Sequence, residues 1–196
     1  MFSDFDRAMM RLALEQADAA RAAGEIPVGA VVTKGGQVVF SARNTREAER
    51  DPAGHAEINA LRGAAKKLNA WRLAGCTLYV TLEPCCMCAG AIVQARIERV
   101  VFGAYDEQAG CCGSLYRVTE DPAFNHFAIA EGGLMAEECR AALIKGIRRE
   151  RGEIEELLDE ADEAAAKSDV RLLHQEVFGK AKEKIRKIVE QSHVID

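Results

Sequence analysis

Long hydrophobic runs are missing from the sequence. No stretch approaches the roughly 18 to 20 consecutive apolar residues that cross a membrane as a helix. The first residues, MFSDFDRAMMRLAL, carry aspartates where a secretory signal peptide has basic side chains. These absences argue against a membrane protein and against a secreted one, so we expect a cytoplasmic location and no membrane partner.

An excess of positive charge is also missing. The 196 residues include 26 basic and 31 acidic side chains, which give a formal net charge of −5. The balance is uneven, since residues 1–150 hold 18 basic and 19 acidic residues and residues 151–196 hold 8 and 12. The chain therefore has no bulk attraction for nucleic acid, and an anionic ligand must meet a local patch on the main body.

Histidine is scarce, with four residues, whereas cysteine is not, with seven. A chain of this length buries a substantial core and does not need disulfide bonds for stability. The number of cysteines is odd, and three of them fall within LEPCCMCAG, residues 82–90. In a reducing compartment this close spacing favours a metal site or reactive thiols over disulfide bonds.

Hydrophobic periodicity predicts an α/β fold. Two β-rich runs flank the glycine turn KGG and form a predicted hairpin. A strand, a helix and a strand follow one another in residues 76–104, which implies parallel pairing, and Pro84 stands at the expected first position of that helix. The result is a mixed sheet of about five strands with helices on both faces. The predicted strands are 28–33, 37–42, 76–82, 99–104 and a short one within 127–134, and the predicted helices are 4–23, 55–68, 84–96 and 135–150.

The composition changes near residue 152. GEIEELLDEADEAAAK carries seven acidic residues before Lys167, and KAKEKIRK reverses the sign of the charge. Both stretches keep leucine or isoleucine at helical spacing, so we predict a helical C-terminal extension of unknown role over 152–196, after a catalytic domain over 1–151. We interpret the basic run 180–187 as a solvated helix face.

Cys85 and Cys88 have the Cys-x-x-Cys spacing that places two thiolates on one side of a helix start. His55, at the start of the helix 55–68, is the candidate third ligand, and three protein ligands leave a fourth position open for water, as in catalytic zinc sites. Glu57, two residues after His55, would then serve as the proton shuttle. The alternatives are a closed structural zinc site with Cys86 or another cysteine as fourth ligand, and Glu57 as an acid favoured by the helix macrodipole.

The motif HAE followed by PCCMC matches the H-x-E…P-C-x-x-C signature of zinc nucleobase deaminases. Four longer strings extend the likeness: GEIPVGAVV, GHAEINALR, TLYVTLEPCCMCAGAIVQARIERVVFGA and NHFAIAEGGLMAEECRAAL. Over residues 5–145 the sequence resembles the bacterial tRNA-specific adenosine deaminases of the cytidine deaminase superfamily.

The resemblance implies a three-layer α/β/α fold, a homodimer, and hydrolytic conversion of adenosine to inosine at the wobble position of a tRNA anticodon loop. By position, it implies that His55, Cys85 and Cys88 bind one Zn2+ per subunit, that Glu57 is catalytic and that Asn44 binds the substrate. The alternative for Asn44 is a turn residue after a strand, a common role of asparagine.

Two other functions remain open. One is a deaminase of a free nucleobase or nucleoside of the guanine, cytosine or cytidine type, which the low positive charge favours. The other is a noncatalytic zinc-stabilised interaction module. For the remaining candidates we predict that Cys111 and Cys112 are packed loop thiols, that Cys76 and Cys139 are core residues and that His126 is not a ligand. We expect the dimer interface at the small-residue helix 84–96.

Overall fold

The structure is a computed structural model, and it describes residues 1–145. Residues 1–144 form one compact unit. The predicted extension 152–196, its boundary at 151/152 and the last part of the predicted helix 135–150 lie outside the described residues. Among residues 1–145, no helix combines the length and the apolar character that crossing a membrane requires.

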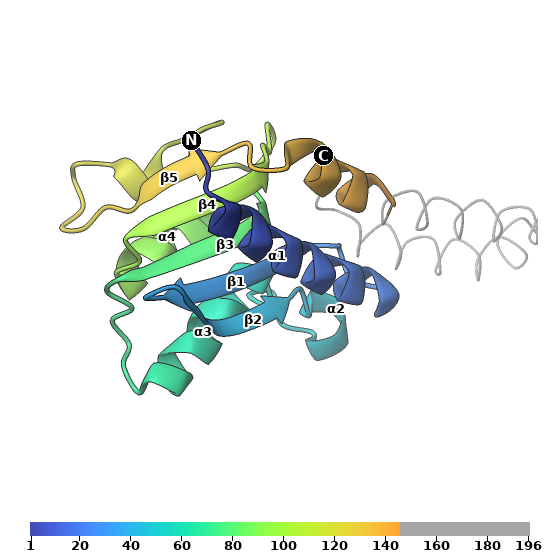
Figure 1. Ribbon diagram of the computed structural model, residues 1–196, viewed down its shortest axis with the longest axis horizontal. Helices are drawn as coiled ribbons and strands as arrows, with labels where there is room; N and C mark the ends of the chain where they lie inside the picture. The colour runs from blue at the N-terminus through green and yellow to red at the C-terminus, as the bar shows by residue number, and fades with distance from the viewer. Residues whose placement is uncertain (146–196) are drawn as a thin grey trace, which may run out of the picture. The chain divides into compact units, whose positions relative to one another are not determined.

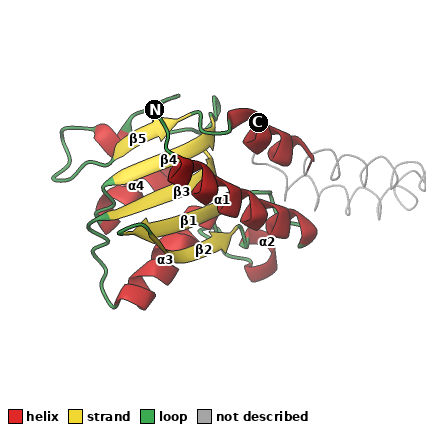
Figure 2. Ribbon diagram, viewed as in Figure 1, coloured by secondary structure: helices red, strands yellow, loops and turns green. Residues whose placement is uncertain are grey.

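A five-stranded sheet forms the centre of the unit, in the order β2-β1-β3-β4-β5 (Figure 2). β1 is antiparallel to both β2 and β3, whereas β3, β4 and β5 are parallel. The predicted mixed sheet and the parallel pairing across residues 76–104 are therefore confirmed. The strands are β1 (Gly29–Lys34), β2 (Gln37–Arg43), β3 (Cys76–Leu82), β4 (Arg99–Ala104) and β5 (Ile129–Gly132).

Helices cover both faces of the sheet (Figure 1). The helix α1 (Asp4–Ala22) lies on one face, and α3 (Ala56–Leu68) and α4 (Cys86–Ala95) lie on the other. Alternate residues of β3 separate the two cores, because Leu78 and Val80 pack with the α3 and α4 side while Tyr79 packs with the α1 side. Residues 136–145 are also helical, and Cys139 packs with the α1 side. The predicted three-layer architecture is confirmed.

Two close fits between backbones depend on glycine. The β1–β2 turn places Gly35 and Gly36 at positive φ, 57° and 75°, which matches the twist of a two-residue hairpin. Where α1 crosses β1, a Cβ on Gly29 would lie 2.0 Å from the carbonyl oxygen of Ala13. Helix and strand therefore approach closely enough for Ala13 and Ala17 to be fully buried.

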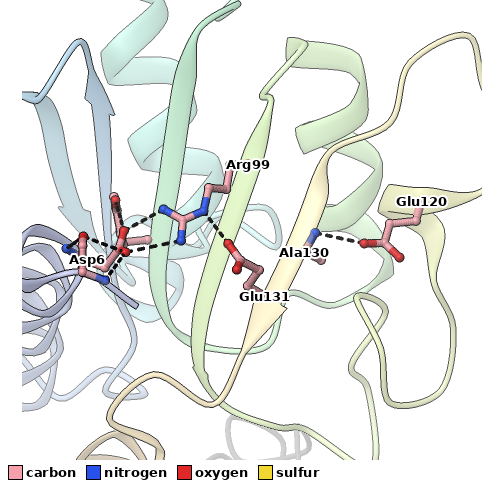
Figure 3. Close-up of polar contacts among 7 residues, drawn as sticks. Asp6, Arg99, Glu120, Ala130 and Glu131 are labelled. Carbon is pink, nitrogen blue, oxygen red and sulfur yellow. Dashed lines mark hydrogen bonds and ion pairs between the residues drawn. The ribbon is translucent and has the colours of Figure 1, made fainter. Parts of the chain in front are cut away.

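A partly buried ion pair ties the start of α1 to the sheet (Figure 3). Ser3 and Asp6 form a capping box at the helix N-terminus. The Asp6 carboxylate also accepts hydrogen bonds from the Tyr79 hydroxyl at 2.7 Å and from Arg99 Nη1 at 2.6 Å. Arg99 in turn pairs with Glu131 of β5 through its Nε. Side chains from α1, β3, β4 and β5 thus share one network.

Two local features differ from the sequence prediction. The helix α4 begins at Cys86, two residues after Pro84, because Cys85 is extended (ψ 175°) and its backbone pairs with Gly110. The polar segment 43–54 contains a short helix, α2 (Arg46–Glu49), that no local cap signals. Glu25, distant in sequence, caps it instead by accepting hydrogen bonds from the backbone amides of Glu47 and Ala48.

Candidate metal centre and active site

The N-termini of α3 and α4 meet behind the sheet and carry the candidate ligands. His55 is the N-cap residue of α3 and Cys85 is the N-cap residue of α4, and both have extended backbone conformations. Neither side chain caps its own helix, so the imidazole and the thiol point elsewhere. Cys88 follows in the first turn of α4. The positive ends of both helix dipoles therefore face the same place, which favours thiolate over thiol.

The three candidate ligand atoms lie within 4.8 Å of one another. His55 Nδ1 is 3.8 Å from Cys85 Sγ and 3.6 Å from Cys88 Sγ. A tetrahedral zinc with ordinary Zn–S and Zn–N bond lengths separates sulfur and nitrogen ligands by about 3.6 Å. The spacing of this donor set therefore suits one zinc ion without rearrangement of the backbone.

Without a metal, the electrostatics of the donor set favour a thiolate at Cys85 and the protonated forms of Cys88 and His55. A hydrogen bond from the Cys88 thiol lowers the pKa of Cys85 to about 4, against the opposing effect of burial, and His55 lowers it further. The same hydrogen bonds raise the pKa of Cys88 and of His55. At Cys85 a thiolate is thus already favoured, and a cysteine must be deprotonated to bind zinc.

Cys86 does not join this set. Its side chain is exposed. Among residues 1–145, the group of side chains that could hold a metal ion consists of His55, Cys85 and Cys88. A closed site with Cys86 as fourth ligand has no support in this geometry. Three ligands from the protein leave a position open for water, which is the arrangement of catalytic zinc sites.

Glu57 is buried beside the ligands, with 4% of its surface exposed. It occupies the first turn of α3, two residues after His55. Burial raises the pKa of its carboxyl group, while a backbone hydrogen bond and the charge of His55 lower it in part. A carboxyl group with increased proton affinity next to an open metal position can accept a proton and return it.

Asn44 lies at the end of β2 and is also buried. Its backbone amide donates to Val28, and its side-chain amide donates to Glu25 at 3.4 Å. Glu25 therefore orients Asn44 and caps α2 with the same carboxylate. GEIPVGAVV contains Glu25, but nothing local to that string indicates these contacts, so the sequence analysis gave Glu25 no role.

Asn59 joins the Asn44 segment to the His55 segment. Its side-chain amide donates to the carbonyl oxygen of Arg43 at 3.1 Å and to the Thr45 hydroxyl at 2.9 Å. A longer contact of 3.4 Å reaches the carbonyl oxygen of Gly54, immediately before His55. Asn59 is another residue without a role in the sequence analysis, and it fixes the two candidate site segments side by side.

Glu83 organises the loop on the other side of the candidate ligands. Its buried carboxylate accepts hydrogen bonds from the backbone amides of Asp106, Cys112 and Ser114 at 2.9 to 3.1 Å, and from the Ser114 hydroxyl. Since Glu83 is two residues before Cys85, it anchors the loop 105–114 directly beside the candidate metal ligands. In the sequence, only the position of Glu83 within LEPCC points to a role near the site. Its role as a hydrogen-bond acceptor depends on amide donors more than 20 residues later in the chain.

The remaining cysteines and His126 have structural surroundings. Cys111 and Cys112 are buried in the loop, and Cys76 and Cys139 are buried in the two cores. The His126 Nε2 lies 2.7 Å from the carbonyl oxygen of Ile97, far from the candidate ligands in the fold. These placements agree with the predictions for the four cysteines.

The family model for the cytidine and deoxycytidylate deaminase zinc-binding region matches residues 3–104. The protein belongs to this deaminase family. Among its curated relatives, the tRNA-specific adenosine deaminase of Haemophilus influenzae is 48% identical over 159 residues, covering 80% of this chain and 92% of the relative. The enzyme of the same name from Bacillus subtilis is 46% identical over 138 residues, covering 70% and 86%.

Solved structures of the deaminase family agree with the fold. One, from work on A-to-I editing by tRNA:A34 deaminases at the wobble position of transfer RNA, is 39% identical with a TM-score of 0.67 and covers 69% of this chain and 98% of its own. A guanine deaminase from Nitrosomonas europaea is 25% identical with a TM-score of 0.61 and covers 74% and 85%. The fold is thus shared by deaminases of different substrates.

Proposed function

We propose that this deaminase converts adenosine to inosine at the wobble position of a tRNA anticodon. The observation that supports hydrolytic deamination is the buried Glu57 beside three candidate zinc ligands, His55, Cys85 and Cys88, which leave a fourth coordination position for water. The observation that favours adenosine in tRNA is identity of 40 to 48% to several tRNA-specific adenosine deaminases. In the reaction, water adds at C6 of adenine and ammonia leaves, which gives hypoxanthine on the same ribose.

Each residue has a separate task in this proposal. His55, Cys85 and Cys88 hold one zinc ion, which when bound lowers the pKa of water and supplies a nucleophile at neutral pH. Glu57 removes a proton from the attacking water and delivers protons to the purine ring and the departing amine. Asn44, held by Glu25, contacts the purine nucleoside. Glu83 holds the loop 105–114 beside the segment that carries Cys85 and Cys88.

The anticodon loop of tRNA is the proposed partner. Its bases are single-stranded, so extruding one into a pocket requires only modest unstacking. A homodimer and a cytoplasmic location complete the proposal, and both stay predictions.

A free purine base is the second candidate substrate. The likeness to guanine deaminase of Nitrosomonas europaea supports it, with identity of 25%. The tRNA-specific adenosine deaminase of Haemophilus influenzae is 48% identical, and the match covers 92% of its length. This greater identity favours RNA as the substrate.

The test is an inosine assay with zinc-loaded full-length protein. The substrates are an anticodon stem-loop with adenosine at the wobble position and, separately, guanine, cytosine, adenosine and cytidine. We expect inosine in the RNA, and we expect Glu57→Gln to lower turnover by about 10²- to 10⁴-fold, as loss of a general acid–base does. Zinc content measured by mass spectrometry should stay at one per chain in this variant.

Glu15→Gln, on the exposed surface of α1, is the matched control and should keep full activity. Turnover of a free base alone would replace the RNA assignment with the second candidate. Absence of any turnover, with normal zinc content, would instead support the noncatalytic module.

A further inference from the structure

A basic groove runs along the edge of the sheet between β2 and α3. It encloses about 880 Å³ and is not part of the zinc ligand set. We call it the α3–β2 groove, and the residues that matter here are Phe40 and Arg43 from β2, Glu49 from α2, and Arg62, Lys66 and Lys67 from α3. Four cations and one carboxylate thus line one hollow of a chain whose net charge is −5.

These cations are available to a ligand. Arg62, Lys66 and Lys67 are exposed, and Arg43 is half-buried. Arg62 contacts Asp51 at 3.4 Å, but within residues 1–145 neither lysine nor Arg43 forms an ion pair. Arg62 and Lys66 are four residues apart on α3, where two like charges repel and slightly destabilise a helix. An anion bound between them would remove that repulsion.

One aromatic side chain, Phe40, lines the groove. The Phe40 ring lies against Gly63, because a Cβ on Gly63 would come within 2.3 Å of two ring atoms. Phe40 nevertheless keeps 38% of its surface exposed. Positive charge beside an accessible aromatic ring is the combination that single-stranded RNA uses, through phosphates and through stacked bases.

Two residues that line the groove, Arg43 and Asn59, also contact segments of the candidate active site. Arg43 immediately precedes Asn44, and its guanidinium donates to the Asn44 carbonyl oxygen at 3.2 Å. Asn59, which holds the Asn44 and His55 segments together, also lines the groove. An RNA backbone held by Arg43 and the α3 cations would therefore lie next to the segment that carries Asn44.

Helix electrostatics explain only part of this arrangement. Lys66 and Lys67 lie in the last turn of α3, where the macrodipole favours cations. This effect accounts for neither Arg43, which comes from β2, nor the exposed Phe40 ring. We propose that the α3–β2 groove binds the sugar–phosphate backbone of the RNA substrate next to the reacting nucleotide. The inference rests on the proposed RNA substrate and adds a second contact surface to it.

The experiment measures RNA binding and turnover separately. Fluorescence anisotropy of a labelled anticodon stem-loop is recorded from 50 to 300 mM salt with zinc-loaded full-length protein and with Lys66→Gln/Lys67→Gln. Arg7→Gln/Arg11→Gln, at two exposed arginines on α1, is the control with the same change in charge. Loss of two phosphate contacts should lower the slope of log affinity against log salt by about 1.4 to 1.8.

We expect the lysine variant to bind RNA more weakly, with a reduced salt slope, while the arginine control matches the native chain. The KM for the stem-loop should rise and kcat should stay unchanged, because the groove lies outside the reacting centre. Three results would overturn the proposal that the groove binds RNA. Both variants could weaken RNA binding equally, neither could change it, or the native chain could fail to bind RNA. Groove-dependent binding without inosine would uphold that proposal while the proposed function fails.

Discussion

Cys85 and Cys86 are adjacent in sequence but have opposite surroundings. Cys85 is extended at the start of α4, and its thiol faces His55 at 3.8 Å, whereas Cys86 is exposed. A helix start turns successive side chains by about 100°, so neighbouring cysteines cannot both reach one metal. The three-residue interval from Cys85 to Cys88, in contrast, returns the second thiol to the same side.

Replacement of each cysteine by serine separates an open site from a closed one. We expect Cys85→Ser to lose stoichiometric zinc and all deaminase activity, because a serine hydroxyl is not a thiolate ligand. Cys86→Ser should keep one zinc per chain and unchanged activity. Metal content by mass spectrometry, together with thermal melting with and without chelator, measures both, and chelator should lower the melting temperature of only the zinc-loaded proteins. Zinc loss in Cys86→Ser would reinstate the closed structural site.

An ionic network adds to the apolar packing that attaches the helix α1 to the sheet. Burial raises the pKa of Asp6, but hydrogen bonds from Arg99, Ser3 and Tyr79 lower it more strongly, so its pKa lies well below the usual range. A carboxyl group with a lowered pKa stabilises the fold at pH values above its unfolded pKa of about 3.9. That contribution is lost as the pH falls toward the lower pKa of the folded state.

Asp6→Asn should therefore destabilise the protein at pH 7 and reduce its sensitivity to acid. We expect a loss of about 1 to 3 kcal/mol in the free energy of unfolding, less than for a fully buried pair because Arg99 keeps 29% exposure. Between about pH 5 and pH 3 the native protein should lose stability more steeply than the variant. Urea titrations at several pH values measure this, with exposed Asp4→Asn as control; parallel acid limbs would disprove the linkage.

Elements that carry their own periodicity were predictable, whereas those held by distant contacts were not. The helix 55–68 and the strands 76–82 and 99–104 have patterns that specify one buried face or two, and the structure has them at these bounds to within one residue. The helix α2 escaped prediction because its cap is Glu25, more than 20 residues away. The start of α4 was placed too early because proline at a first helical position is only a preference.

The candidate site divides in the same way. His55, Glu57, Cys85 and Cys88 follow from short spacings, and the structure brings the three ligands together. Glu25, Asn59 and Glu83 have no such spacing, since their roles are hydrogen bonds to segments up to 31 residues away. Sequence patterns thus indicate the groups that react, while the groups that orient them require the fold.

At the scale of the whole molecule, one helix surface is suited to close contact with a second copy. Met87, Gly90, Ala91 and Gln94 lie at helical spacing on the side of α4 that faces away from the sheet, and all four are partly or fully exposed. A Cβ on Gly90 would meet no atom within 4 Å in the chain. Small residues allow backbones to approach closely, so this surface fits the predicted dimer interface.

Gly90→Arg should abolish the dimer without harm to the subunit. The free space around Gly90 accommodates a side chain, and arginine is a better helix former than glycine by up to about 1 kcal/mol. Light scattering coupled to gel filtration should give twice the 21.4 kDa chain mass for the native protein and the single mass for the variant. Ala19→Arg, on the exposed surface of α1, should remain dimeric. A monomeric native protein would refute the dimer prediction itself.

The candidate zinc ligands come from two segments separated by the exposed turn after α3. Asn69, Ala70, Trp71 and Arg72 are all exposed there, and the chain reverses direction before β3 begins. A peptide bond cut in this turn would leave His55, Glu57 and Asn44 on one fragment and Cys85 and Cys88 on the other. Neither fragment could hold the metal alone. Deaminase activity from such a nicked chain would show that the two fragments stay associated. The pairing of β1 with β3 and a shared zinc ion would hold them together.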